Sequence, residues 1–122
     1  MASLNISLTL THDNKQKIKE TIAETTAGNI FDHQRVVIGT SETQITIITG
    51  IGNANWVFLK NLDVANYVEV GFATTVYNMK LTANASASYS QFAFFPITPG
   101  ATTLYLKANT NPVDVEYFCI ER

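Results

Sequence analysis

The chain alternates apolar and polar residues over most of its length, and this period of two is the feature that most limits its fold. Residues 4–10 show it strictly, with Leu or Ile at every even position and Asn, Ser or Thr at every odd one. A β-strand with this pattern sends its apolar side chains to one face, whereas a helix would spread them around its axis. Residues 43–49 and 103–108 alternate similarly. The chain is therefore expected to fold from strands.

The densest apolar block, residues 55–72, is interpreted as a β-hairpin. Two apolar-rich runs at 56–59 and 67–72 flank a segment with Asn and Asp that suits a tight turn. The rest of the chain is expected to add strands around this hairpin. These strands are predicted at residues 4–10, 36–38, 43–49, 89–95, 103–108 and 113–120. Residues 76–81 are expected to be a short strand or an extended loop, and residues 27–35 a loop.

Residues 15–26 fit two patterns. Ile18 and Ile22 lie four residues apart, as on one face of a helix, but alternation also places them with Glu20 on one face of a strand. Two isoleucines make a thin stripe for a helix, and the threonines at the end of the segment prefer extended backbone. A strand, at the edge of a sheet, is the favoured interpretation, and a helix is the alternative.

About eight short strands, separated by turn residues, predict an all-β fold. We expect residues 1–122 to form a single antiparallel β-sandwich of jelly-roll or Greek-key type. A chain of this length can bury a core without disulfides or metals. Residues 1–26 are expected to be an N-terminal arm, or edge strands, that contact other subunits.

The low charge of the chain restricts its partners. Charged residues make up 15% of it, against roughly 25% in an average soluble domain, so Thr, Ser and Asn must supply much of the surface. Such a neutral polar surface suits packing against neighbouring subunits. A net charge of −2 and eight scattered Lys and Arg residues argue against nucleic acid. Lys15, Lys17 and Lys19 are the local cluster, expected on one side of a strand as a solvated face.

No catalytic or metal-binding constellation is recognised, so neither an enzyme nor a cofactor is predicted. Cys119, the single cysteine, cannot form an intramolecular disulfide and is expected to be a small buried hydrophobe. A nucleophile would need His12 or His33 as its base. Asp32 and His33 are neighbours whose side chains point in different directions, so they are assigned no role. Glu69 interrupts an apolar strand and is expected to be exposed on its other face.

Two further patterns are given structural interpretations. Trp56 could form a sugar-stacking platform with tyrosines, although packing in the core or between subunits is the more common use of aromatic residues. The tyrosines concerned are Tyr67, Tyr77, Tyr89, Tyr105 and Tyr117. The sequons at Asn5 and Asn84 are attributed to chance, because the first ten residues do not read as a signal peptide. No membrane segment is predicted, and folding is expected in a reducing cytoplasm.

Three stretches resemble small structural proteins of tailed bacteriophages. They are VFLKNLDVANYVEVG at residues 57–71, IGTSET at 38–43 and LYLKANTNPVDVEYFCIER at 104–122. The resemblance implies a virion protein made in the host bacterial cytoplasm, and a small sandwich suits a capsid decoration or cement protein. Its expected partners are the major capsid protein and copies of itself, in a homo-oligomer such as a trimer. A phage tail, neck or fibre component and a carbohydrate-binding module are the alternatives.

Overall fold

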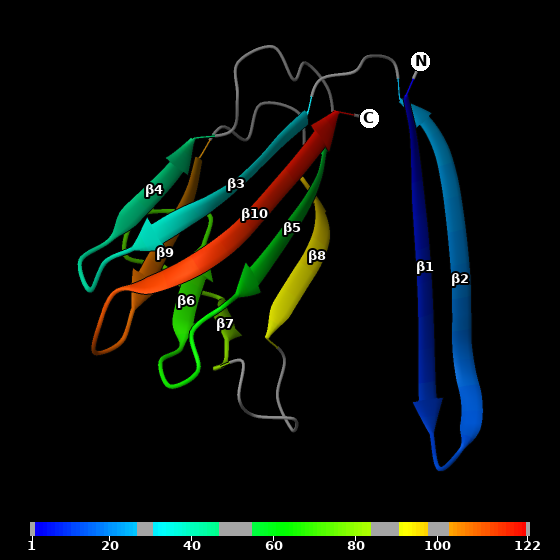
Figure 1. Ribbon diagram of the computed structural model, residues 1–122, viewed down its shortest axis with the longest axis horizontal. Coiled ribbons are helices and arrows are strands. Elements are labelled where there is room, and N and C mark those ends of the chain that lie inside the picture. Colours follow the sequence, from blue (N-terminus) through cyan, green and yellow to red (C-terminus); the bar gives the residue numbers. More distant parts are fainter. Residues whose placement is uncertain (1, 27–30, 47–54, 84–90, 98–102, 122) are drawn as a thin grey trace.

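A computed structural model of the chain describes residues 2–26, 31–46, 55–83, 91–97 and 103–121. These residues form ten β-strands, and every strand pairing among them is antiparallel (Figure 1). The strands are β1 (Ala2–His12), β2 (Lys15–Thr26), β3 (Phe31–Ile38), β4 (Thr43–Thr46), β5 (Asn55–Asn61), β6 (Val68–Gly71), β7 (Met79–Leu81), β8 (Phe92–Ile97), β9 (Thr103–Ala108) and β10 (Val113–Glu121). The prediction of an all-β, antiparallel fold is confirmed. The described residues contain no helix long and apolar enough to cross a membrane.

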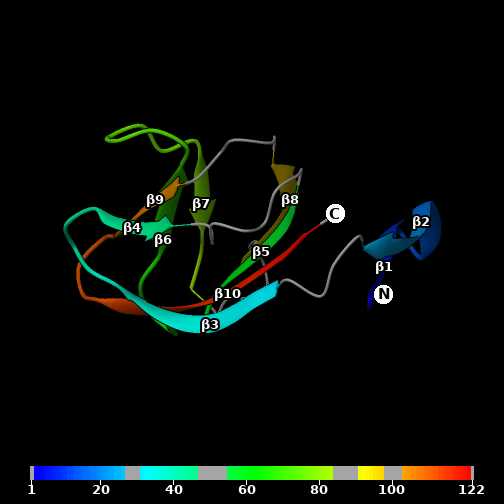
Figure 2. The same ribbon diagram turned by 90° about the horizontal axis from the view of Figure 1, so that it is seen from above.

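Eight of these strands form two four-stranded sheets that lie face to face (Figure 2). One sheet has the order β3-β10-β5-β8 and the other the order β4-β9-β6-β7. The core lies between the two sheets, because apolar and polar residues alternate along each strand and every second side chain points inward. The inward side chains include Val57, Leu59, Val68, Val70, Leu104, Leu106, Val115 and Tyr117, all essentially inaccessible to solvent.

The remaining two strands, β1 and β2, form a separate hairpin beside the sandwich (Figure 1). Asp13 and Asn14 make its two-residue turn with φ angles of 52° and 58°, the left-handed conformation that a type I′ turn requires. Residues 15–26 are therefore a strand, as favoured. The strand is paired with β1 along its whole length because the turn directs the chain straight back.

A bulge changes the expected arrangement of the hairpin's lysines. The register moves from Leu10 opposite Ile18 to Thr11 opposite Gln16, so Lys17 is the additional residue of β2. Lys19 lies opposite Thr9 and Lys15 opposite His12. Positions 9 and 12 alternate to opposite faces of β1. The prediction that all three lysines share one side was therefore wrong.

Two predictions for the sandwich were also wrong. Residues 55–72 are no hairpin, because β5 and β6 belong to different sheets and pair with β10 and β9 respectively. Residues 31–35, expected in a loop, belong to β3, where they pair with the second half of β10. In both places the pairing is decided by a partner that lies far away in the chain.

The aromatic strand predicted at 89–95 is shifted. It runs from Phe92 through Pro96 to Ile97, whereas Tyr89 lies outside the described residues. Pro96 is accommodated because β8 is at the end of its sheet's strand order, where a missing N–H costs no ladder bond on the outer side.

Candidate functional site

One half of the outer surface of sheet β3-β10-β5-β8 is aromatic. Trp56 and Phe58 of β5, Phe92 and Phe94 of β8, and Phe118 of β10 alternate with core residues and so point outward. The Trp56 and Phe94 rings stack at 5.1 Å between centroids and 8° between planes. The ring centroids of Phe58 and Phe92 lie 5.9 Å apart. We call these five residues the aromatic face.

The other half of the same surface is polar. Arg35 forms an ion pair with Asp114, and Glu116 lies opposite both Arg35 and Lys60 in the strand register. Lys60 also lies opposite Phe92, so it borders the aromatic face. Val37 is exposed here, at a distance from the aromatic cluster along the strand.

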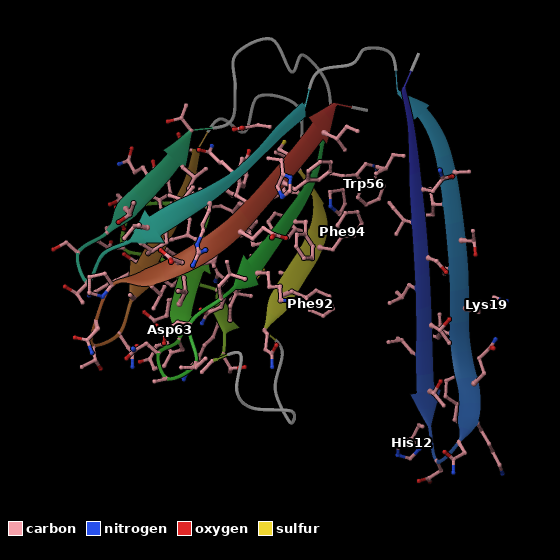
Figure 3. All side chains as sticks on the ribbon, viewed as in Figure 1. His12, Lys19, Trp56, Asp63, Phe92 and Phe94 are labelled. Carbon is pink, nitrogen blue, oxygen red and sulfur yellow. The ribbon has the colours of Figure 1, made fainter. Side chains whose placement is uncertain are left out.

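The hairpin turns its own apolar side toward the aromatic face. Figure 3 shows Trp56, Phe92 and Phe94 projecting from the sheet toward the hairpin. Between the two lies an open groove of about 690 Å³. Its hairpin wall consists of Leu4, Asn5, Ile6, Ser7, Leu8, Glu20 and Ile22, and its sheet wall is the aromatic face. Glu20 is the ionisable residue in this lining. The groove is therefore an apolar surface suited to binding another protein.

Exposure along the hairpin rises toward its turn. Leu4, Ile6 and Ile22 are half-buried, whereas Leu8, Leu10 and Ile18 are 46%, 47% and 47% exposed. Leu10 and Ile18 are directly opposite each other and lie outside the groove lining. The end of the hairpin thus presents apolar side chains that the described part of its own sandwich does not cover.

Neither His12 nor His33, the candidate bases, lies beside the Cys119 thiol. Cys119 is buried in the core, as predicted, and burial raises the pKa of its thiol. His33 points to the opposite side of the same sheet, where its ring contacts Phe118 edge-on at 5.7 Å. His12 lies at the hairpin turn, with Nδ1 3.4 Å from the Asp13 carboxylate. Asp32, opposite Cys119 in the register, accepts a hydrogen bond from Gln34.

The remaining candidates are surface or structural residues. Glu69 lies between two buried valines, is itself half-exposed and is opposite Lys80 and Lys107, which confirms that it points out of the core. Within the described ranges no three His, Cys, Asp or Glu residues gather where they could hold a metal ion.

The four described tyrosines of the proposed platform do not join Trp56, and Tyr89 lies outside the described residues. Tyr117 is in the core, and its pKa is raised by burial. The Lys80 ammonium lies 3.9 Å from the centroid of the Tyr67 ring, a cation–π contact. The Tyr77 hydroxyl donates a hydrogen bond to Glu42, and Tyr105 belongs to the other sheet. Phenylalanines accompany Trp56 instead. The signal that could have identified them is the alternation of residues 56–59 and 92–95, which places one aromatic set outside the core.

Comparison of the chain with protein families, with curated protein sequences and with solved structures finds no match.

Proposed function

We propose that this protein is a non-enzymatic structural subunit of a bacteriophage virion, a decoration or cement protein bound to the major capsid protein lattice. The observation that carries the proposal is the apolar groove between the hairpin and the aromatic face, a surface suited to protein contacts. The resemblance of residues 38–43, 57–71 and 104–122 to phage structural proteins supports a location in the virion. Assembly in the virion would follow synthesis in the host cytoplasm.

The strand order supports assigning the sandwich to the jelly-roll type. Consecutive strands from β3 to β6 cross between the two sheets, β7 remains beside β6, and β8 to β10 cross again. This alternation between two four-stranded sheets agrees with the two Greek keys of a jelly roll and supports the proposed type. Such a rigid body presents its outer faces and loops at fixed positions.

Rigidity is what a cement protein contributes. A rigid subunit that contacts several capsid proteins makes them separate together, so weak contacts add to a strong total. The neutral Thr- and Asn-rich surface supplies polar contacts, and a homo-oligomer such as a trimer multiplies them. No cofactor takes part in this function.

Quantitative mass spectrometry of purified virions of the encoding phage tests the proposal. A cement protein should be present in copy numbers comparable with those of the major capsid protein. A few copies per particle would instead indicate the tail, neck or fibre alternative. Absence of the protein, with good coverage of other structural proteins, would refute a virion role.

The stack of Trp56 on Phe94, two half-buried residues in the wall of the groove, favours one second candidate, a carbohydrate-binding module. Sugars bind flat aromatic surfaces, and Glu20 supplies a polar group across the groove. A glycan array, followed by titration of the Trp56 fluorescence, tests it. Unchanged fluorescence and an array without ligands would exclude this function.

A further inference from the structure

The hairpin is longer than the surface it faces. Its root faces the sheet wall across the open groove, while its turn, marked by His12 in Figure 3, projects beyond the strands of the sandwich (Figures 1 and 3). Leu10 and Ile18 are at this projecting end and are each 47% exposed. The sandwich of the same chain leaves this part of the apolar side open.

The apolar side of such a hairpin has to pack against another surface. An isolated two-stranded hairpin is marginally stable in water, and β1 and β2 make their close strand contacts with each other in the described part of the chain. Four residues lie between β2 and β3, so Thr26 and Phe31 are at most about 18 Å apart, which keeps the root near its own sheet. The open end is therefore available to another molecule.

We propose that this molecule is a second copy of the same chain, and that the hairpin is an exchange arm. The apolar side of β1–β2 in one copy packs on the aromatic face of the next copy. The inference concerns the free protein in solution and does not depend on the virion assignment.

Two properties of the surfaces favour a second copy over an unrelated partner. The chain carries both halves of a matching contact, an aliphatic strip and an aromatic face, and Phe92 of that face is 56% exposed. Their charges also match, because Glu20 lies within the strip and Lys60 borders the aromatic face beside Phe92. In a reciprocal exchange each arm covers the aromatic face of another copy. The closed assembly then leaves no arm and no aromatic face uncovered.

The first test is the mass of the full chain in solution, measured by light scattering after size exclusion over a range of concentrations. We expect a discrete oligomer that dissociates on dilution. Leu10→Glu on the arm and Phe92→Glu on the sheet should each weaken association at least tenfold. A wild-type protein that is monomeric at all concentrations would overturn the proposal. The same result is expected if the arm binds only other proteins.

The controls use positions of similar exposure outside the contact. Thr9→Glu changes the neighbouring residue on the opposite side of the arm, and Val37→Glu changes an exposed residue at the polar end of the same sheet surface. Both should leave the mass unchanged. Circular dichroism of all four variants verifies that they are folded. If Thr9→Glu and Leu10→Glu weakened association equally, the contact would not be made by the Leu10 side of the arm, and the proposal would be refuted.

Cross-linking between chains tests the exchange itself. Chains with Leu8→Cys are mixed with differently tagged chains that carry Phe92→Cys and are then mildly oxidised. Disulfides between the two kinds of chain should exceed those between identical chains, and the pair of Leu8→Cys with Val37→Cys should show no such excess. A double Leu8→Cys/Phe92→Cys chain that forms only an intramolecular disulfide would overturn the proposal, because the arm would then close on its own sheet.

Discussion

The side-chain amide of Asn61 donates a hydrogen bond of 2.8 Å to the carbonyl oxygen of Asn66, at the point where the chain passes from one sheet to the other. The same nitrogen lies 3.2 Å and 3.1 Å from the carbonyl oxygens of Leu81 and Thr82. Its Oδ1 accepts a hydrogen bond from the N–H of Asp63. Asn61 is fully buried and therefore ties the end of β5 to the loop before β6 and to the end of β7.

Replacing Asn61 with Leu should lower the free energy of unfolding by about 3 kcal/mol, because several buried backbone groups lose their partner. Urea denaturation measures the change. Asn78→Leu, at an exposed position, is the matched control and should change stability by less than about 0.5 kcal/mol. A small effect at Asn61 would mean that water replaces the amide.

Gly71 should tolerate no side chain. A Cβ atom there would lie 1.7 Å from the carbonyl oxygen of Val76, and this neighbour is backbone that cannot turn away. Gly71→Ala should destabilise the protein by about 3 kcal/mol or prevent folding. At Gly39 the nearest atom would be 3.7 Å away, so Gly39→Ala should fold normally. Thermal unfolding compares the two variants, and similar melting temperatures would contradict the close packing at Gly71.

The Glu42 carboxylate holds the segment after β6 in place. It accepts hydrogen bonds from the N–H of Thr75 at 2.7 Å and from the hydroxyls of Tyr77 at 2.6 Å and Thr74 at 2.8 Å. These bonds hold the pKa of Glu42 below its ordinary value of 4.5, the Thr75 N–H contributing most. The bond to Glu42 raises the pKa of Tyr77 to about 12.

The lowered pKa of Glu42 predicts how stability depends on pH. As pH falls, the Glu42 carboxylate is protonated in the unfolded chain before it is protonated in the folded one. The contribution of Glu42 to the free energy of unfolding is therefore complete above about pH 4.5 and is lost as pH falls through the lower pKa of the folded protein. Tyr77→Phe removes one donor, so melting temperature should decline less steeply in acid. Melting curves from neutral pH to about pH 3 measure this. Tyr105→Phe is the control, and an equally shallow decline there would contradict the role of Tyr77.

Cys119 should be unreactive in the native protein, because its thiol is buried in the core and burial raises its pKa. Alkylation by iodoacetamide at neutral pH should be at least about 100-fold slower than in urea, where the chain is unfolded. A Thr9→Cys chain supplies an exposed thiol as the control. Native labelling of Cys119 at the rate of that exposed thiol would show that the core opens readily.

Local pattern predicted much of the sandwich. Val113, Val115, Tyr117 and Cys119 alternate along the chain, and all four point into the core. The turn at Asp13 and Asn14 was likewise readable, because these residues tolerate a positive φ. Such features depend on neighbours in sequence, which is why they could be predicted.

The candidate site was not predictable in the same way. Phe58, Phe94 and Phe118 meet because β5 pairs with β8 on one side and with β10 on the other, in a register that places these three rings opposite one another. The sequence showed aromatic residues in each strand without indicating that they would share a surface. The assignment of β5 and β6 to different sheets was missed for a related reason, since it depends on their pairing with β10 and β9, which lie far away in the chain.

The sequence by itself determined that the chain forms strands and which side chains of several strands turn inward, because alternation and turn chemistry act between near neighbours. Only the tertiary structure decided which strands lie side by side, where the aromatic rings gather and that the hairpin extends past its own sheet. Those properties follow from hydrogen-bond ladders between segments far apart in the chain, whose register no local pattern encodes.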